Sequence, residues 1–235
     1  MKKTKIVCTV GPASHSKDTL TKMHRAGMNG ARINTAYGTI SQYKDMIETI
    51  RAAADIPIIV DIKGPEIRLR TRANRTVKKG DVLEAGFKNE PISFSRNFLN
   101  NVDAGDNILI DNGKLRMRIT EKHENTLKLV ALTPGEIDDG KGVNIPGKTL
   151  TIPTLSPRDR EMLSLAKEKD VEFIALSFTR NARDLENLKK QAHGFNGATI
   201  AKIENSEGVN NFNQILNLAD GIMIARGDLG VEIEP

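Results

Sequence analysis

The chain of 235 residues has little of several residue types that mark common protein classes. Its one cysteine, Cys8, excludes an internal disulfide framework and a zinc site built from several cysteines, and it is typical of a reducing compartment. Aromatic residues make up 4% of the chain and tryptophan is absent, so few side chains could stack on nucleic-acid bases. No apolar run approaches the roughly 20 residues of a membrane-spanning helix. We therefore expect a cytoplasmic protein that binds neither membranes nor nucleic acids.

The amino terminus and the charge balance support this expectation. The apolar run after the basic opening covers only residues 6–10, whereas the apolar core of a secretory signal has about 7–15 residues. The 35 Lys and Arg residues against 30 Asp and Glu residues give a formal net charge of +5. These charges are interspersed along the chain, which indicates a solvated surface that is also compatible with small anionic substrates.

Short apolar segments alternate with amphipathic segments over the first 68 residues. Ser16 is typical of a helix N-cap, and Gly27 is typical of the position that ends a helix. The predicted elements, in chain order, are strand 5–10, helix 16–26, strand 30–34, helix 40–54 and strand 57–61. This order of strands and helices predicts a parallel sheet.

The pattern changes between residues 69 and 148, where we find short strand-like runs and turns but no long helical pattern. The strand-like runs cover residues 82–83, 108–110, 115–119 and 127–132. Turn residues separate them, among them Asp111-Asn112-Gly113 and Asp138-Asp139-Gly140. We therefore predict an all-β domain inserted into an α/β domain.

The α/β alternation returns at Ser156-Pro157, a helix start with proline at the first helical position. The predicted elements are helix 156–169, strand 171–178, helix 182–192, strand 199–203, helix 209–218 and strand 221–225. A (β/α)₈ barrel has eight strands and about 250 residues, whereas six strands are predicted here. The predicted fold is an α/β incomplete TIM-type barrel, formed by residues 1–68 and 149–235, with residues 69–148 inserted after the third strand. Its open sheet edges predict a homo-oligomer or a companion chain.

Charged side chains gather where the last predicted strands end. Lys202 and Glu204 are two residues apart and therefore share a face of their strand, while Asp228 follows the next strand. If these strands are neighbours, Glu204 and Asp228 can converge on one Mg²⁺ or Mn²⁺ ion, which prefers oxygen ligands. Lys202 would then place positive charge where a phosphoryl group or an enolate develops negative charge.

The earlier strands end in the same way. The second strand ends in Arg32 and Asn34, and the third ends in Asp61 and Lys63, followed by Glu66 and Arg68. Arginine suits bidentate binding of phosphate. Because all of these residues lie at the carboxyl ends of parallel strands, the pattern favours an active site there.

Several segments of the chain resemble pyruvate kinases. The matching segments are KIVCTVGPAS at 5–14, ARIN at 31–34, KGPEIR at 63–68, GVNIPG at 142–147, FIALSF at 173–178, AKIEN at 201–205 and ARGDLGVE at 225–232. The resemblance implies a Mg²⁺-dependent transfer of the phosphoryl group of phosphoenolpyruvate to ADP, giving pyruvate and ATP. It also implies that the inserted domain acts as a lid, and that the family's last two barrel strands and its C-terminal domain have no counterpart in these 235 residues.

The resemblance assigns roles to individual residues. Lys202 and Arg32 are the implied catalytic residues, with Lys202 stabilising the transferred phosphoryl group and Arg32 contacting phosphate. Glu204 and Asp228 are the implied ligands of Mg²⁺ or Mn²⁺. The residues implied to bind the substrates phosphoenolpyruvate and ADP or ATP are Arg68, Lys141, Ser177 and Gly227.

A potassium ion is also implied by the resemblance. Asn34 and Asp61 would help to bind K⁺, and Glu66 accompanies K⁺ dependence in the family. Two residues depart from the family pattern, since Ala36 replaces a serine that supplies a K⁺ ligand and Tyr37 replaces a histidine on the nucleotide side.

Two other functions compete with the kinase. A metal-dependent aldolase or lyase of the related phosphoenolpyruvate and pyruvate barrels also pairs a glutamate with an aspartate after successive strands, although Lys202 and the inserted domain argue against it. A non-catalytic or partner-dependent protein is favoured by the six-stranded barrel and by the altered K⁺ loop.

Overall fold

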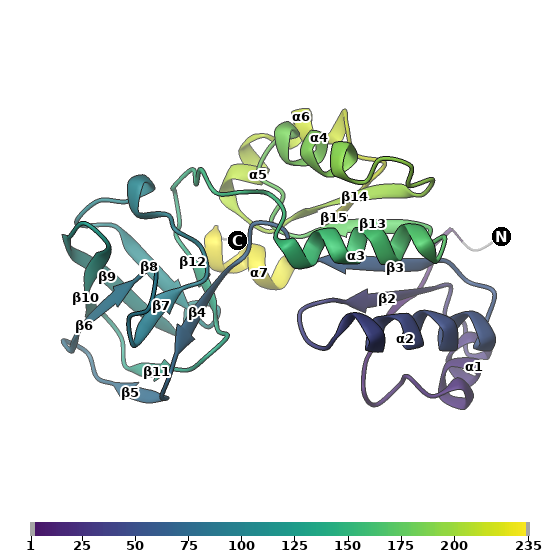
Figure 1. Cartoon of the computed structure of the whole chain (residues 1–235), viewed down its shortest axis with the longest axis horizontal. Helices are drawn as coiled ribbons and strands as arrows, with labels where there is room; N and C mark the ends of the chain where they lie inside the picture. The colour runs from purple at the N-terminus through teal and green to yellow at the C-terminus, as the bar shows by residue number, and fades with distance from the viewer. Residues whose placement is uncertain (1–2, 234–235) are drawn as a thin grey trace. The chain divides into compact units, whose positions relative to one another are not determined.

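The computed structural model describes residues 3–233, which divide into two compact units (Figure 1). The first unit contains the chain up to Gly64 together with Thr154–Ile203 and Asn211–Met223. The second contains Pro65–Pro153, Glu204–Asn210 and the chain from Ile224 onward. The domain boundaries that the sequence places after residues 68 and 148 stay predictions.

A parallel sheet organises the first unit. Its strand order is β1-β2-β3-β13-β14-β15, which follows the order of these strands along the chain. The strands are β1 Val7–Val10, β2 Gly30–Asn34, β3 Ile58–Ile62, β13 Phe173–Leu176, β14 Ala198–Ile203 and β15 Gly221–Ile224. The recorded pairings from β1 through β14 are all parallel. The predicted parallel α/β sheet is confirmed as a mixed α/β half-barrel.

Helices cover one face of this sheet (Figure 1). They are α1 Lys17–Arg25, α2 Ile40–Ala53, α3 Pro157–Glu168, α4 Ala182–Gln191 and α6 Phe212–Leu216. The two helix starts predicted at Ser16 and Ser156 are capped as expected. The Ser16 side chain accepts a hydrogen bond from the Thr19 amide, and the Ser156 side chain accepts one from the Asp159 amide. Buried Tyr43, Ile47 and Ile50 pack this side of α2 into the core.

The two faces of the sheet differ in chemistry. All five residues of β3 are buried, and alternate residues Ile58, Val60 and Ile62 belong to the helix-covered core. Ile59 and Asp61 therefore point to the opposite face, because successive side chains of a strand alternate. Asp61 therefore lies on the face away from the helices and near the carboxyl end of β3, where the sequence predicts an active site.

Two elements differ from prediction. The helix predicted over 209–218 is two short helices, α5 Ser206–Asn210 and α6, and the side-chain amide of Asn211, which lies between them, donates to the Arg180 carbonyl oxygen (3.1 Å). The strand predicted over 171–178 is only β13, because Phe178 adopts a positive φ of 52° that ends extended structure.

The second unit is built around a closed β-barrel with the strand order β10-β6-β7-β4-β12-β8-β9. These strands are β4 Ile67–Thr71, β6 Val82–Gly86, β7 Ile92–Phe94, β8 Asn107–Ile110, β9 Leu115–Lys122, β10 Thr126–Ala131 and β12 Gly142–Asn144. A separate pair is formed by β5 Arg75–Val77 and β11 Gly135–Ile137, and the 3₁₀ helix Leu99–Asn101 lies between strands. The barrel encloses its own apolar core. The four strand-like runs of the sequence are confirmed, whereas β4, β5, β7, β11 and β12 were not predicted.

The turn at Asp111-Asn112-Gly113 joins β8 and β9, as its sequence predicts. All three residues have positive φ values, of 51°, 55° and 78°. Asp, Asn and Gly tolerate this left-handed conformation better than other residues, which is why they favour tight hairpins. The antiparallel pairing of β8 with β9 follows directly from this turn.

The last helix of the described chain, α7 Arg226–Glu232, was not predicted. It belongs to the second unit, as do the residues of α5. The segments that directly follow β14 and β15 are therefore grouped with the β-barrel and not with the sheet from which they emerge.

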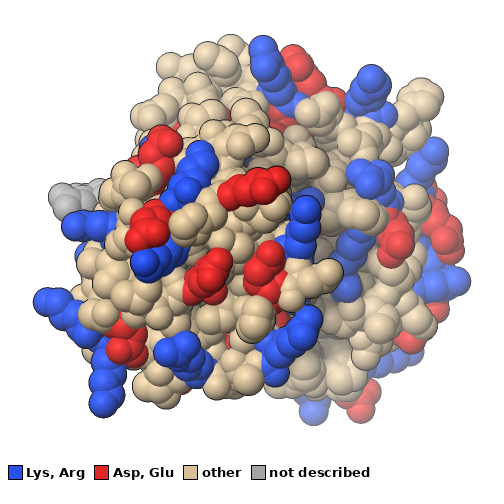
Figure 2. Space-filling model, turned by 60° about the vertical axis from the view of Figure 1, so that its left-hand side comes forward, with Lys and Arg blue, Asp and Glu red and all other residues tan. Residues whose placement is uncertain are grey.

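Among residues 3–233, no helix combines the length and the apolar character needed to cross a bilayer. Figure 2 shows Lys and Arg side chains interspersed with Asp and Glu side chains on the face in view.

The edge strand β15 is tied to β14 through Asp220, which gives a pH-dependent prediction. Its Oδ2 accepts from the Thr199 amide and hydroxyl, both at 2.8 Å, and the amide hydrogen bond is the main cause of a lowered Asp220 pKa. A carboxyl whose pKa is lowered by folding stabilises the protein above its unfolded pKa, and this stability is lost as the pH falls through the folded value.

We expect Asp220→Asn to lower the melting temperature at pH 7 by a small amount, since the side chain is half exposed. The difference from the unmodified protein should shrink as the pH falls below the unfolded pKa of about 3.9, because the Asp220 carboxylate then becomes protonated. Thermal melts of both proteins between pH 7 and pH 3 measure the difference in melting temperature. A difference that stays constant with pH would contradict the role given to the Asp220 carboxylate.

Candidate functional site

Four of the predicted site residues meet in one buried network in the first unit. The Lys202 Nζ atom lies 3.1 and 3.0 Å from the two carboxylate oxygens of Asp61 and 2.6 Å from the Ser177 hydroxyl oxygen. The Ser177 hydroxyl lies 2.9 Å from Asp61 Oδ1, to which it donates. Lys202, Asp61 and Ser177 are each less than 8% exposed. Side chains from the carboxyl ends of β14 and β3 and from the residue after β13 therefore meet at one place.

Arg32, the fourth member of the network, approaches from β2. Its Nε and Nη2 atoms lie 2.7 and 2.6 Å from Asp61 Oδ2, and its Nη1 atom donates to the Thr9 hydroxyl at 2.9 Å. The guanidinium is therefore held from two neighbouring strands. Thr9 was not predicted, although its position opposite Arg32 in the register of β1 and β2 places the two side chains on the same face of the sheet.

Two cations of the network, Arg32 and Lys202, share the carboxylate of Asp61. Charges that are removed from water need partners, and Asp61 is a partner to both. Arg32 is the more exposed of the two cations, with 23% of its side chain accessible. This arrangement can attract an anionic oxygen to the carboxyl edge of the sheet.

The backbone around the network is fixed by residues that sequence reasoning missed. Buried Asp159 accepts hydrogen bonds from the Ser156 amide and hydroxyl, and its other oxygen accepts from the Lys63 amide at 3.0 Å. The signal was present as a capping box, the Ser156-x-x-Asp159 pattern at the start of α3. Thr35 donates from its hydroxyl to the Asp61 carbonyl oxygen at 2.8 Å and fixes the end of β3.

The groups predicted to bind K⁺ do not present a free ligand set. Asn34 Oδ1 accepts from the Ala36 amide at 2.9 Å, and both oxygens of Asp61 are held by Arg32, Ser177 and Lys202. Ala36 has no side-chain oxygen to offer. A third cation on Asp61 would be repelled by the two already there.

The predicted divalent-metal ligands lie in the second unit. Glu204 is buried, with 1% of its surface exposed, and directly follows β14, while Asp228 is half-buried in α7 beside the exposed Gly227. Two carboxylates form a hard-oxygen donor pair of the kind that suits Mg²⁺ or Mn²⁺ when substrate oxygens and water complete the sphere. No cluster of three or more His, Cys, Asp or Glu ligands occurs among the described residues. The chemistry of these two side chains is compatible with a metal whose other ligands come from a substrate and from water.

Arg68 and Lys141 lie close together on the barrel. Arg68 Nη1 donates to the Gly140 carbonyl oxygen at 2.7 Å and Nη2 lies 2.5 Å from Glu66. The Lys141 Nζ atom lies 3.3 Å from the Asp111 carboxylate. Contacts from Lys114 and, next, from Lys141 lower the pKa of Asp111 despite the opposing effect of desolvation. Both predicted nucleotide-side cations are thus placed on neighbouring strand ends of one unit.

Glu232, at the end of α7, joins segments that are distant in the sequence. Its Oε1 accepts from the Asn144 side-chain amide at 2.9 Å, and its Oε2 accepts a longer bond of 3.4 Å from the Ser206 hydroxyl. Burial raises the pKa of the Glu232 carboxyl, and the bond from Asn144 partly offsets this. Sequence reasoning assigned Glu232 no role, because its partners come from β12 and α5.

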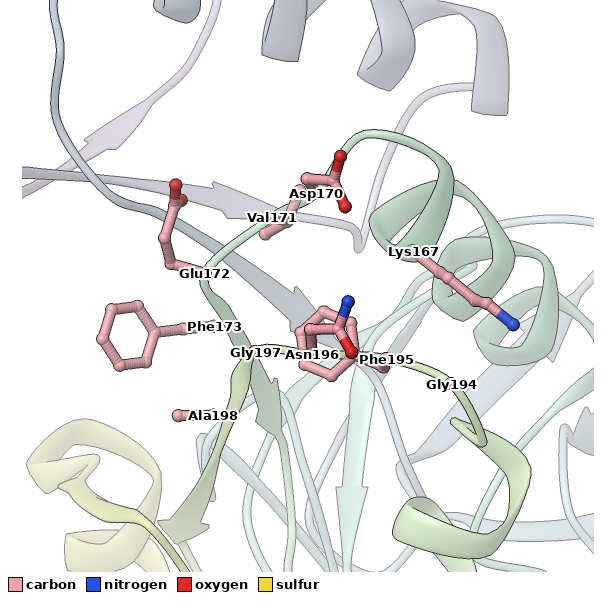
Figure 3. Close-up of a pocket in the computed structure, with 10 residues that line it drawn as sticks. All are labelled: Lys167, Asp170, Val171, Glu172, Phe173, Gly194, Phe195, Asn196, Gly197 and Ala198. Atoms are coloured by element: carbon pink, nitrogen blue, oxygen red, sulfur yellow. The ribbon is translucent and has the colours of Figure 1, made fainter.

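A separate pocket of about 310 Å³ lies at the opposite end of the sheet, where β13 and β14 begin (Figure 3). Two of its charged side chains have structural partners. The Lys167 Nζ atom donates to the His193 carbonyl oxygen at 3.0 Å, and Glu172 is paired with Arg51 at 2.7 Å. The pocket therefore lies apart from the residues of the predicted site.

The fold and the network describe a mixed α/β protein in which two cations, Arg32 and Lys202, lie near the carboxyl ends of a parallel sheet. The family model described as "Pyruvate kinase, barrel domain" matches residues 1–235. The chain therefore belongs to the pyruvate kinase family.

The chain is also similar in sequence to curated proteins that are named pyruvate kinase. The chain is 38% identical to the pyruvate kinases of Staphylococcus haemolyticus and Sporosarcina psychrophila and 36% identical to that of Staphylococcus aureus strain MRSA252. Each alignment covers 100% of this chain and only 43% of the relative. The chain thus spans less than half the length of these relatives.

Proposed function

We propose that the chain carries the catalytic site of a pyruvate-kinase-type phosphotransferase, which transfers the phosphoryl group of phosphoenolpyruvate to ADP with Mg²⁺ or Mn²⁺. The observation that carries this proposal is the buried network in which Lys202 and Arg32 share Asp61 at the carboxyl edge of the sheet. The proposed architecture is the TIM-type barrel of the family, of which the six-stranded sheet is a part, with residues 69–148 as an inserted lid.

The residues act mainly by placing charge. The Lys202 ammonium is held in position by Asp61 and Ser177, so it need not reorganise when negative charge develops on the phosphoryl group and on the enolate oxygen. Arg32 has N–H groups and partial exposure suited to a phosphate oxygen. These two side chains bind and orient the anionic substrate, and the network excludes water behind them.

Glu204 and Asp228 would hold the divalent cation, which supplies Lewis-acid neutralisation of phosphate charge when bound. Gly227 and Asp228 backbone groups would receive the substrate carboxylate. Arg68 and Lys141 would bind the phosphates of ADP or ATP from the barrel. A homo-oligomer or companion chain and a cytoplasmic location remain part of the proposal.

The test is the formation of pyruvate from phosphoenolpyruvate and ADP in the presence of Mg²⁺, with and without K⁺, alongside a Lys202→Met control. Activity that needs ADP, Mg²⁺ and Lys202 supports the kinase. Pyruvate formed without ADP from an oxo-acid would favour the aldolase or lyase instead. Activity no greater than that of the control would contradict catalysis by this chain and favour the non-catalytic or partner-dependent alternative.

A further inference from the structure

The two segments that carry Glu204 and Asp228 are attached to the β-barrel. Glu204–Asn210 and the chain from Ile224 onward are grouped with Pro65–Pro153 in the second compact unit. Val231 of α7 reaches the β8–β9 turn, because its Cγ1 atom lies 3.4 Å from where a Cβ atom on Gly113 would be. Val231 is therefore one point at which α7 approaches the barrel.

Glu232 supplies that attachment through one carboxylate. Oε1 is bonded to Asn144 of barrel strand β12 at 2.9 Å, and Oε2 faces the hydroxyl of Ser206 at 3.4 Å. Asn144 is itself buried, with 9% of its surface exposed. The carboxylate therefore links three parts of the unit: the barrel, the start of α5 and the end of α7.

The chain spacing places this link next to both proposed metal ligands. Ser206 is two residues after Glu204, and Glu232 is four residues after Asp228, which is about one turn along α7. A shift of the Glu232 carboxylate would move the backbone that carries each ligand. Side chains that fix metal ligands in this indirect way commonly change metal affinity by 10- to 100-fold when they are removed.

We propose that Glu232 is a positioning residue for the divalent-cation site, fixing Glu204 through Ser206 and Asp228 through α7 against Asn144 of β12. This inference rests on the proposed function, since it assumes that Glu204 and Asp228 bind the metal. It differs from a merely structural role because the affinity for the cation should change more than the stability of the fold.

The experiment measures Mn²⁺ binding to the full chain in the presence of phosphoenolpyruvate, from the electron paramagnetic resonance signal of free Mn²⁺. We expect Glu232→Ala to raise the Mn²⁺ dissociation constant about 10-fold or more. Glu232→Gln keeps an oxygen that can accept from Asn144, so it should raise the constant less. Asn144→Ala should raise the constant in the same direction, and the double variant should be no worse than Glu232→Ala, because the bond between Asn144 and Glu232 is already lost in Glu232→Ala.

A matched control is available on the same unit. Glu136 of β11 accepts from the Thr76 hydroxyl at 3.0 and 3.2 Å but touches neither proposed ligand segment, so Glu136→Ala should leave the dissociation constant within twofold. Thermal melts of every variant report whether the fold is intact. Glu232→Gln and Asn144→Ala preserve the test if Glu232→Ala does not fold.

Failure of this inference can be told apart from failure of the proposed function. If Glu204→Gln and Asp228→Asn leave Mn²⁺ binding unchanged, the metal site itself is wrong. If those two variants weaken binding while folded Glu232→Ala and Asn144→Ala stay within twofold of the unmodified protein, the positioning role is overturned.

Discussion

Replacing Lys202 with Met should lower kcat for pyruvate formation by about 100- to 1,000-fold, a loss of roughly 3–4 kcal/mol of transition-state stabilisation. The Lys202 ammonium is the buried cation of the network, and Asp61 and Ser177 fix it within 3.1 Å. Methionine has a similar length but no charge. The KM for phosphoenolpyruvate should change less than kcat, because Arg32 still offers its guanidinium to the phosphate.

The fold should survive this substitution. In the absence of Lys202, Asp61 keeps the two N–H groups of Arg32 and the Ser177 hydroxyl, so the carboxylate is not left unpaired. Lys202→Arg is the matched control, since it keeps the charge but changes its position, and it should retain more activity than Lys202→Met. A kcat within tenfold of the unmodified protein for a folded Lys202→Met variant would remove Lys202 from the catalytic role.

Three residues of the network could be predicted from the sequence, because the carboxyl ends of parallel strands lie at the same edge of a sheet. Arg32 stands two residues before the end of β2, and Asp61 and Lys202 each stand one residue before the end of β3 and β14. What the sequence could not provide is the pairing between side chains. The contact of Ser177 with both Asp61 and Lys202 depends on the register of β3, β13 and β14, which apolar patterns alone do not specify.

The inserted domain was harder to predict at the level of single strands. Its fold class was predicted, but strands of three residues such as β7 and β12 are too short to show an alternating pattern. Their stability comes from barrel closure and not from local propensity. Helix α7 was missed for a related reason, since Gly227 and Gly230 lower the helix propensity of a segment that tertiary packing nevertheless makes helical.

Asp184→Ala should destabilise the protein by about 3–5 kcal/mol, the expected loss when one partner of a buried ion pair is removed. Asp184 is 2% exposed. Its oxygens accept from the Arg180 amide and Nε, both at 2.9 Å, from Arg180 Nη2 at 2.7 Å and from the Thr154 hydroxyl at 2.6 Å. Truncation would leave a buried guanidinium without its carboxylate.

The free energy of unfolding from urea titration measures this effect. Asp45→Ala in α2 is the matched control, since Asp45 is an exposed helical aspartate whose loss should change stability by no more than about 0.5 kcal/mol. The double variant Arg180→Met with Asp184→Leu should recover much of the loss, because it removes both charges together and restores apolar volume. A loss below about 1 kcal/mol for Asp184→Ala would show that Arg180 finds water or another partner, and that the pair contributes little to holding α4 against the residues before α3.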